Sequence, residues 1–233
     1  MRNHFLRASG VPSSGSSIIT DDLVIHLDAG DSSSYSGSGS TWTNIAPSGT
    51  SWGNATLKTS SGLNTYSSSD GGYFTTPRAY IPHPSGSGTF TTFTYSVWCY
   101  PTTVSGGYDT LFDQDNDKWF IGLMNDTFIT YNPTFNVSDF DLLANNWYNL
   151  VVAHTHTQAV RFYSNGQLKF TSTTNSTSHT FSNISIGAGG VTSSSTGDET
   201  WPGRIASILI YDTELTASEV TTNYNAEKAR FGY

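Results

Sequence analysis

The chain has 233 residues, of which 36% are hydrophobic, 14% are aromatic and only 12% are charged. Its formal net charge of −8 and the lack of any basic cluster argue against nucleic-acid binding, which needs a positive surface to neutralise phosphates. One cysteine, Cys99, excludes an intramolecular disulfide. No segment approaches the roughly 18 consecutive apolar residues of a membrane span, so we expect no membrane insertion.

The first 20 residues are rich in serine and glycine and contain little that could be buried, which predicts a flexible N-terminal arm. They lack the apolar stretch of a secretory signal peptide. The alternative to a free arm is a segment that docks on a neighbouring subunit or a larger assembly, with Phe5 and Leu6 as its natural anchors. Residues 21–233 are predicted to form one domain, because β-sandwiches of this length commonly do.

The chain then shows many short strand patterns separated by turn residues. Residues 23–27 form the first. In residues 93–99, Phe93, Tyr95, Val97 and Cys99 alternate with the residues between them, as in a half-buried strand. Shorter strands are predicted at residues 73–74, 111–112, 119–123 and 128–131.

The clearest local signal is a hairpin in residues 147–170. Strand patterns at residues 147–154 and 159–164 are followed by Asn165-Gly166, a pair that suits a two-residue turn with positive φ at both positions, and by a return strand at residues 167–170. Residues 182–186 and 204–211 complete the set. The last of these is apolar on both faces, which predicts a central strand covered on both sides.

One helix is expected, near the C-terminus. Thr216 and Glu219 have the spacing of a capping box, in which each side chain bonds the other residue's backbone N–H. The helix should run from Thr216 to about Arg230 and pack on a sheet. Many short strands with one late helix predict an all-β protein, a two-sheet antiparallel jelly-roll sandwich with a short C-terminal helix.

Four groups of segments together resemble the LamG-like, concanavalin A-like lectin/glucanase jelly roll, and their order and spacing match from about residue 22 to the end. They are residues 23–29 (LVIHLDA) with 34–44; 93–98 (FTYSVW); 146–152 (NWYNLVV) with 160–166 (VRFYSNG); and 184–187 (ISIG) with 201–206 (WPGRIA), 210–211, 215–216 and 219–220.

The opening segment, with residues 223–226 (NYNA) and 230–233 (RFGY), is similar to a narrower group. Its members are stand-alone LamG-like proteins of tailed phages and other aquatic viruses, which are usually virion components. This resemblance implies a virion protein that is assembled in the host cytoplasm, and the missing signal peptide agrees with that localisation.

Catalysis is not expected. Glucanases of the superfamily use paired carboxylates, commonly in a Glu-x-Asp-x-x-Glu pattern on one strand, as nucleophile and acid/base. The chain has no such motif. Its four glutamates, Glu199, Glu214, Glu219 and Glu227, all lie near the C-terminus, and Glu219 is already assigned to a helix cap.

Calcium is the cofactor that we consider. Asp113, Asp115 and Asp117 place oxygen ligands at alternate positions, and hard cations bind such clusters. Asp109 and Asp198 could join them, since members of the superfamily often bind calcium in loops at the rim of the sandwich. The alternative is a solvated acidic turn, because isolated charge runs usually face water.

Glycan contact is the remaining possibility. Sugars stack on aromatic faces, and four aromatic residues in loop-rich stretches could form a carbohydrate-binding platform: Trp52, Tyr108, Trp119 and Trp201. The alternative is that these residues pack in the core or between strands.

Two functions follow from these observations. The first is a non-enzymatic virion structural, decoration or appendage protein, whose partners are other virion proteins or copies of itself and which also contacts host-surface glycans. The second is a calcium-dependent carbohydrate-binding lectin or adhesin of viral or bacterial origin.

Overall fold

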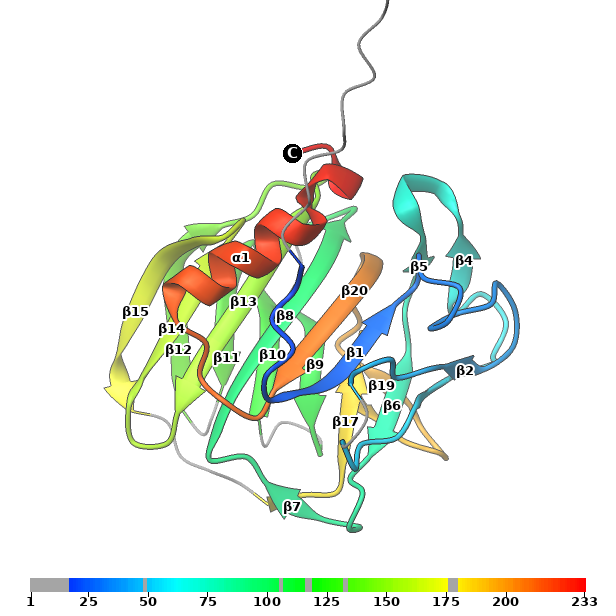
Figure 1. Ribbon diagram of the computed structural model, residues 1–233, viewed down its shortest axis with the longest axis horizontal. Coiled ribbons are helices and arrows are strands. Elements are labelled where there is room, and N and C mark those ends of the chain that lie inside the picture. The colour runs from blue at the N-terminus through cyan, green and yellow to red at the C-terminus, as the bar shows by residue number, and fades with distance from the viewer. Residues whose placement is uncertain (1–16, 48–49, 105–106, 116–118, 132–133, 176–179) are drawn as a thin grey trace, which may run out of the picture.

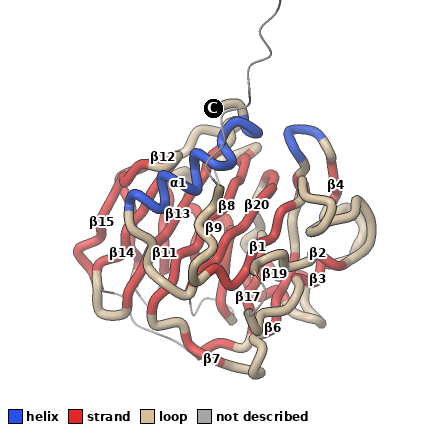
Figure 2. Tube along the Cα trace, viewed as in Figure 1, coloured by secondary structure: helices blue, strands red, loops and turns tan. Residues whose placement is uncertain are grey.

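A computed structural model describes residues 17–47, 50–104, 107–115, 119–131, 134–175 and 180–233. Within these residues the strands form two eight-stranded antiparallel sheets and two two-stranded ribbons. The sheets pack face to face, and Figure 2 shows that strands make up most of the body. The predicted fold class, a two-sheet antiparallel jelly-roll sandwich with a C-terminal helix, is confirmed.

The first sheet, which we call sheet A, carries the strands predicted most clearly from the sequence (Figure 1). Its order is β15 (Gln167–Asn175), β14 (Ala159–Ser164), β13 (Tyr148–Thr155), β8 (Thr92–Pro101), β20 (Gly203–Tyr211), β5 (Tyr73–Thr75) and β4 (Thr65–Ser67). β1 (Leu23–Asp28) also pairs with β20, along the part of that edge that β5 leaves open.

The second sheet, sheet B, has the order β12 (Phe135–Asp141), β11 (Thr127–Tyr131), β10 (Trp119–Met124), β9 (Tyr108–Gln114), β17 (Asn183–Ile186), β6 (Ala79–Pro82), β3 (Ala55–Leu57) and β2 (Thr41–Trp42). The ribbons pair β7 (Gly88–Thr89) with β16 (Thr180–Phe181), and β18 (Gly189–Val191) with β19 (Thr196–Asp198). The helical segments are η1 (Ser69–Gly71), α1 (Ala217–Glu227) and η2 (Lys228–Phe231).

The main core lies between the sheets and follows the two-residue period of the strands. In β8, Phe93, Tyr95, Val97 and Cys99 all belong to this core, whereas Trp98 belongs to a cluster on the other face. The predicted alternation is therefore confirmed, but the expected half-burial is wrong, because Thr94, Ser96 and Trp98 on the other face are buried as well. β20 is buried on both faces, as expected of a strand covered on each side.

α1 covers the outer face of sheet A, where it lies across the strands in Figure 1. The capping box forms: Glu219 N–H donates to Thr216 Oγ1 over 3.3 Å, and Thr216 N–H donates to Glu219 Oε2 over 2.8 Å. Val220 then belongs to the same buried cluster as Tyr163 and Tyr211 of the sheet. The α-helix ends at Glu227, and the remaining expected turn is the 3-10 helix η2.

The β14–β15 turn confirms the hairpin prediction. Asn165 and Gly166 have φ values of 51° and 75°, in the left-handed region that an Asn-Gly pair tolerates. A Cβ atom on Gly166 would lie 2.9 Å from the ring of Tyr224 in α1. Glycine at position 166 therefore allows both the positive φ of the turn and the close approach of α1.

The two ends of the described chain are tied together beneath α1. The Ile19 N–H donates to Asn223 Oδ1 over 2.8 Å, and the Tyr211 hydroxyl donates to the Ile19 carbonyl over 2.9 Å. Ile18 and Ile19, which fall within the predicted arm, are thus packed against the domain. The predicted anchors Phe5 and Leu6 lie outside the described residues.

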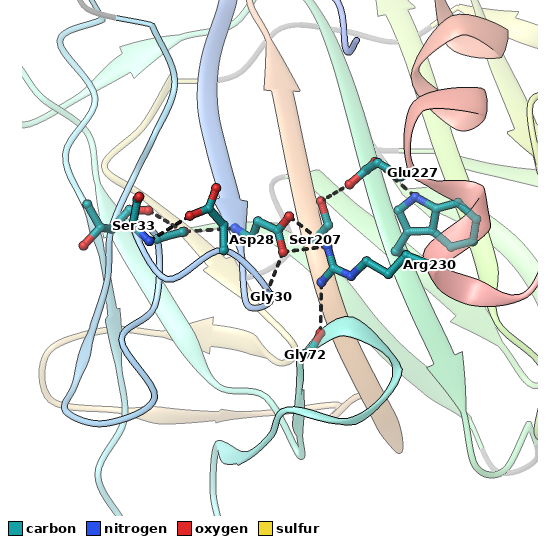
Figure 3. Close-up of polar contacts among 11 residues, drawn as sticks. Asp28, Gly30, Ser33, Gly72, Ser207, Glu227 and Arg230 are labelled. Atoms are coloured by element: carbon teal, nitrogen blue, oxygen red, sulfur yellow. Dashed lines mark hydrogen bonds and ion pairs between the residues drawn. The ribbon is translucent and has the colours of Figure 1, made fainter. Parts of the chain in front are cut away.

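A polar network joins β1 to the C-terminal segment (Figure 3). Arg230 of η2 pairs with the carboxylate of Asp28 over 2.7 Å and donates to the Gly72 carbonyl over 3.0 Å. Beside it, Glu227 accepts from the hydroxyl of Ser207 over 2.7 Å. These contacts fasten the end of the chain to the first strand and to the loop after η1.

Candidate functional site

An aromatic pocket opens on the outer face of sheet B. Trp119, Ile121 and Leu123 of β10 point into the core, so Phe120 between them points outward. Phe120 lies opposite Tyr131 in β11, and Tyr131 lies opposite Phe135 in β12, which places the three rings on one face. The pocket has a volume of about 260 Å³ and is lined by Tyr108, Phe120, Tyr131, Phe135 and Glu199.

The rings of the aromatic pocket touch one another. Tyr108 and Phe135 are parallel to within 7°, with centroids 5.7 Å apart. Phe135 lies 4.8 Å from Tyr131, and Tyr108 meets Phe120 edge-on at 6.0 Å. Tyr108 and Phe135 are 38% and 42% exposed, whereas Phe120 is buried. Phe120 thus forms the floor, and the other rings offer surface to a ligand.

Gly122 makes room for the pocket floor. A Cβ atom at this position would lie 2.0 Å from the carbonyl oxygen of Asp109 and 2.8 Å from Cζ of Phe120. Contacts this short are steric overlaps, so any larger residue would push β9 or the Phe120 ring away. The glycine in the middle of β10 therefore lets the ring of Phe120 extend along the strand toward Tyr108.

Glu199 supplies the polar wall. It follows β19, and its carbonyl accepts from the Thr110 N–H over 2.8 Å, which holds this segment beside β9. Thr200 next to it forms a bridge with Thr110. Glu199 has a φ of 44°, in the left-handed region that residues with a side chain adopt less often than glycine.

Asp109 lies next to Tyr108 on β9. Desolvation raises the pKa of its carboxyl group to about 6, and its Oδ2 atom is buried without a hydrogen-bond partner. Asp109 lies opposite Leu123 of β10, whose side chain points into the core. It therefore faces away from Tyr108 and does not line the pocket.

Of the four aromatic residues predicted to form a platform, only Tyr108 lines the pocket. Trp119 and Trp201 are buried in the core, so a sugar cannot stack on them; for these two residues the platform is wrong and the alternative, packing in the core, is confirmed. Trp52 is half-buried and stacks with Phe90 at 5.6 Å. The predicted platform of four rings does not form.

Sequence reasoning missed Phe120, Tyr131, Phe135 and Glu199. The alternation of β10 could have revealed Phe120, because successive side chains of a strand point to opposite faces. If Trp119 points into the core, Phe120 must point outward. Phe135 could not be found in this way, since β12 was not predicted. Glu199 reaches the pocket through a long-range bridge that no local pattern reveals.

The aspartates considered for calcium are dispersed in the described residues. Asp113 is buried and accepts from the Gly190 N–H over 2.9 Å, and Asp115 accepts from both the N–H and hydroxyl of Ser182. Asp198 is exposed, and Asp117 lies outside the described residues. Within the described part of the chain, no three His, Cys, Asp or Glu side chains could hold a metal ion together. Calcium binding therefore stays a prediction from the sequence.

Comparison with known proteins places the chain in a family. The profile described as "Concanavalin A-like lectin/glucanases superfamily" matches residues 68–221, more than half of the sequence. The chain belongs to this superfamily. Its resemblance to the concanavalin A-like jelly roll is thereby confirmed, whereas the narrower resemblance to phage proteins is not shown. No curated protein matches the chain.

Several solved structures share the fold of this chain at low sequence identity. Domain 4 of AbnA, an extracellular arabinanase from Geobacillus stearothermophilus in complex with arabinotriose, has a TM-score of 0.63 and 17% identity, over 87% of this chain and 98% of that domain. Trypanosoma rangeli sialidase in complex with sialic acid has a TM-score of 0.63 and 15% identity, over 94% of this chain and 35% of that protein.

A third similar structure comes from a study of the cell entry of botulinum neurotoxin type C and its interaction with two ganglioside molecules. It has a TM-score of 0.59 and 15% identity, over 89% of this chain and 52% of that one. The superfamily domain described here thus spans about a third of the sialidase and half of the neurotoxin chain. None of the helices in its described residues has the length and apolar character needed to span a membrane.

Proposed function

We propose that the protein is a non-catalytic carbohydrate-binding module and that the aromatic pocket on sheet B is its glycan site. The observation that carries the proposal is the convergence of four aromatic residues and Glu199 in the lining of one surface pocket. Aromatic faces bind the C–H faces of sugars, while a carboxylate accepts hydrogen bonds from hydroxyl groups. Both chemistries meet at this one place on sheet B.

The size of the pocket agrees with a small saccharide. Its volume of about 260 Å³ lies just below the range of about 300–1,000 Å³ that is typical of sites for drug-sized ligands. One or two sugar residues fill such a space, and the rest of an oligosaccharide would extend across the exposed faces of Phe135 and Val137.

The superfamily relationship supports a sugar ligand. Solved structures with this fold include a complex with arabinotriose, a complex with sialic acid and a neurotoxin that interacts with gangliosides. Because the identities are 15–17%, these structures support the class of ligand and not a particular sugar. Some of these neighbours are glycosidases, so we test catalysis separately.

A glycan array followed by calorimetry tests the proposal. The protein should bind a subset of saccharides, and Tyr108→Ala and Phe135→Ala should each weaken binding at least about tenfold, because stacking on a ring is worth about 1–3 kcal/mol in comparable base–aromatic contacts. Leu143→Ala, which removes an exposed apolar side chain outside the pocket lining, is the matched control. Unchanged affinity in both pocket variants would refute the site.

Incubation of the protein with the saccharides that it binds tests the absence of catalysis. We expect the saccharides to remain intact, since the chain lacks the paired-carboxylate motif of the superfamily's glucanases. Steady release of shorter products would show that the module is an enzyme.

Display on a virion and dependence on calcium remain predictions of the sequence. Immunogold labelling of purified particles would test the first. A thermal-shift measurement with and without a chelator would test the second, because an ion that binds only the folded state raises the unfolding temperature.

A further inference from the structure

We propose that the chain carries a second saccharide site, on the outer face of sheet A, which binds a neutral sugar independently of the aromatic pocket. The site is a pocket of about 400 Å³, within the range of about 300–1,000 Å³ that is typical of small-molecule sites. We call it the helix pocket; its lining includes Arg161, Tyr163, Leu168, Glu214, Leu215 and Thr216. The second site goes beyond the proposed function, which the aromatic pocket alone could fulfil.

The helix pocket lies between the β14–β15 hairpin and the segment that leads from β20 into α1. Val160 and Phe162 of β14 point into the core, so Arg161 between them points to the outer face, where Tyr163 also lies. Leu168 of β15 lies opposite Tyr163 and is 49% exposed. The start of α1, which lies across this sheet in Figure 1, closes the other side of the pocket.

Tyr163 brings an unused polar group to the helix pocket. The residue is only 2% exposed, yet its hydroxyl forms no hydrogen bond with the described part of the chain. A buried tyrosine hydroxyl usually has a partner, because burial without one costs free energy. The hydroxyl can both donate and accept, so a ligand in the pocket can supply the missing partner.

The charges in the helix pocket are compensated. Arg161 forms an ion pair with Oε1 of Glu214, and the Thr155 hydroxyl donates to the other carboxylate oxygen over 2.6 Å. Among the described residues of the lining, Arg161 and Glu214 are the only charged ones, so the lining carries no net charge. An anionic or a cationic ligand therefore gains little from electrostatic attraction there.

Arg161 nevertheless keeps donors for a ligand. Its guanidinium has five N–H groups, its printed contact with Glu214 uses Nη1 alone, and 39% of the side chain is exposed. Both oxygens of Glu214 are already engaged, so the free groups of the pair are mainly donors. Ligand oxygen atoms that accept from Arg161 are the complement of this wall.

A neutral sugar matches these features together. Its hydroxyl oxygens can accept from Arg161 and exchange a hydrogen bond with Tyr163, while its C–H groups contact Leu168 and Leu215. A purely apolar ligand would displace water from the two polar side chains without replacing the hydrogen bonds, which costs free energy.

The helix pocket and the aromatic pocket lie on opposite faces of the sandwich. One is on the outer face of sheet A and the other on the outer face of sheet B, with the core between them. A short saccharide cannot reach both, so each site fills independently. A chain with two such sites can hold two glycan strands at once and gain avidity on a surface that presents many of them.

Calorimetry on the full chain with neutral trisaccharides, namely maltotriose, cellotriose and xylotriose, tests the second site. For at least one of them we expect two molecules bound per chain. The double variant Tyr108→Ala/Phe135→Ala, which removes the aromatic pocket, should retain one. Changing the salt concentration from about 0.05 M to 0.5 M should leave this remaining binding unaltered, because salt screens charges and the ligand has none. Trigalacturonic acid should not bind the double variant more tightly than the neutral sugars.

Two further changes in the double-variant background locate the remaining binding. Tyr163→Phe removes only the hydroxyl and should weaken it about threefold to tenfold, since one hydrogen bond is lost. Leu168→Ala removes an exposed apolar contact and should weaken it as well. Lys169→Ala, next to Leu168 but outside the lining, is the matched control and should have no effect. Equal unfolding temperatures would show that the variants keep the fold.

The outcomes distinguish the second site from the proposed function. One trisaccharide per chain, with none bound to the double variant, would overturn the second site and leave the aromatic pocket standing. Remaining binding that Tyr163→Phe and Leu168→Ala leave intact would also overturn it. Binding to the wild type that only the helix-pocket variants weaken would support the second site and refute the aromatic pocket. Failure of every saccharide to bind would overturn both.

Discussion

The indole Nε1 of Trp98 donates a hydrogen bond of 3.1 Å to Oε2 of Glu227. Trp98 projects from β8, near the middle of sheet A, and Glu227 is the last residue of α1. The other carboxylate oxygen accepts from Ser207 of β20 (Figure 3). One carboxyl group therefore connects the end of the helix to two adjacent strands, in surroundings from which water is largely displaced.

This arrangement predicts an unusual pH dependence of stability. Desolvation raises the pKa of Glu227 from 4.5 to about 7, and the charge of Asp28 adds to the effect, while Ser207, Arg230 and Trp98 oppose it. The folded state then binds the proton more tightly than the unfolded state. The free energy of unfolding should rise, by up to about 3 kcal/mol from this group, as the pH falls from 8 to 5.

Urea denaturation between pH 5 and 8 measures this effect. Glu227→Gln keeps an amide that can contact Trp98 and Ser207 and should flatten the pH dependence. Asp109, whose pKa is raised to about 6, contributes in the same direction, so that Asp109→Asn should flatten it further. Asp139→Asn, at an exposed position, is the control. A slope that Glu227→Gln leaves unchanged would contradict the assignment.

Replacement of Arg230 should loosen the junction between the two ends of the domain. Arg230→Gln leaves the partly buried carboxylate of Asp28 without its ion pair and removes the bond to the Gly72 carbonyl. We expect a loss of about 2 kcal/mol in the free energy of unfolding, measured by chemical denaturation. Adding Asp28→Asn should recover part of the loss, because the unpaired charge is then gone. If the losses in unfolding free energy of Arg230→Gln and Asp28→Asn simply add in the double variant, Arg230 and Asp28 do not stabilise each other.

Gly122→Ala should damage the fold and the pocket together. Its Cβ would overlap the Asp109 carbonyl and the ring of Phe120, so we expect a loss of about 1–3 kcal/mol in stability and weaker glycan binding. Gly53→Ala is the matched control, because a Cβ there meets nothing within 4 Å. It should change stability by less than about 0.5 kcal/mol. Equal behaviour of the two variants would mean that the space beside Gly122 is not needed.

Thr216→Ala tests the helix cap. The variant leaves the Glu219 N–H and the side chain of Glu219 without their partner hydroxyl, and it should cost about 1 kcal/mol in thermal or chemical denaturation. Ser218→Ala, two positions later and exposed, should cost much less. A large cost for Ser218→Ala alone would locate the helix start elsewhere.

The sequence was sufficient for the fold wherever the local pattern was strong. The alternation of β8, the Asn165-Gly166 turn and the capping box at Thr216 each depend on residues close together in the chain, and all three were predicted. β12 was missed because its residues, FNVSDFD, are polar and charged enough to read as a loop, and their place in the sheet comes from pairing with β11. Tertiary pairing overrides weak local preference in this way.

The site was harder to predict than the fold. Tyr108 was identified, but the sequence left open whether Trp119 and Trp201 form a surface platform or pack in the core, and the structure buries both of them in the core. Position relative to a turn does not reveal which face of a strand a residue occupies, whereas register does. The lining combines β9, β10, β11, β12 and the residue after β19, so only the assembled sheet brings it together.

The tie between the two ends of the chain has a consequence for how the protein is made. Ile19 bonds to Asn223 and Asp28 to Arg230 across 204 and 202 positions of sequence, and the interior strand β20 lies between partners that were synthesised much earlier. Such a high contact order favours slow folding. Sheet A cannot form completely while β20 is still inside the ribosome. Until β20 emerges, the nascent domain exposes the edge of β8 that later pairs with it.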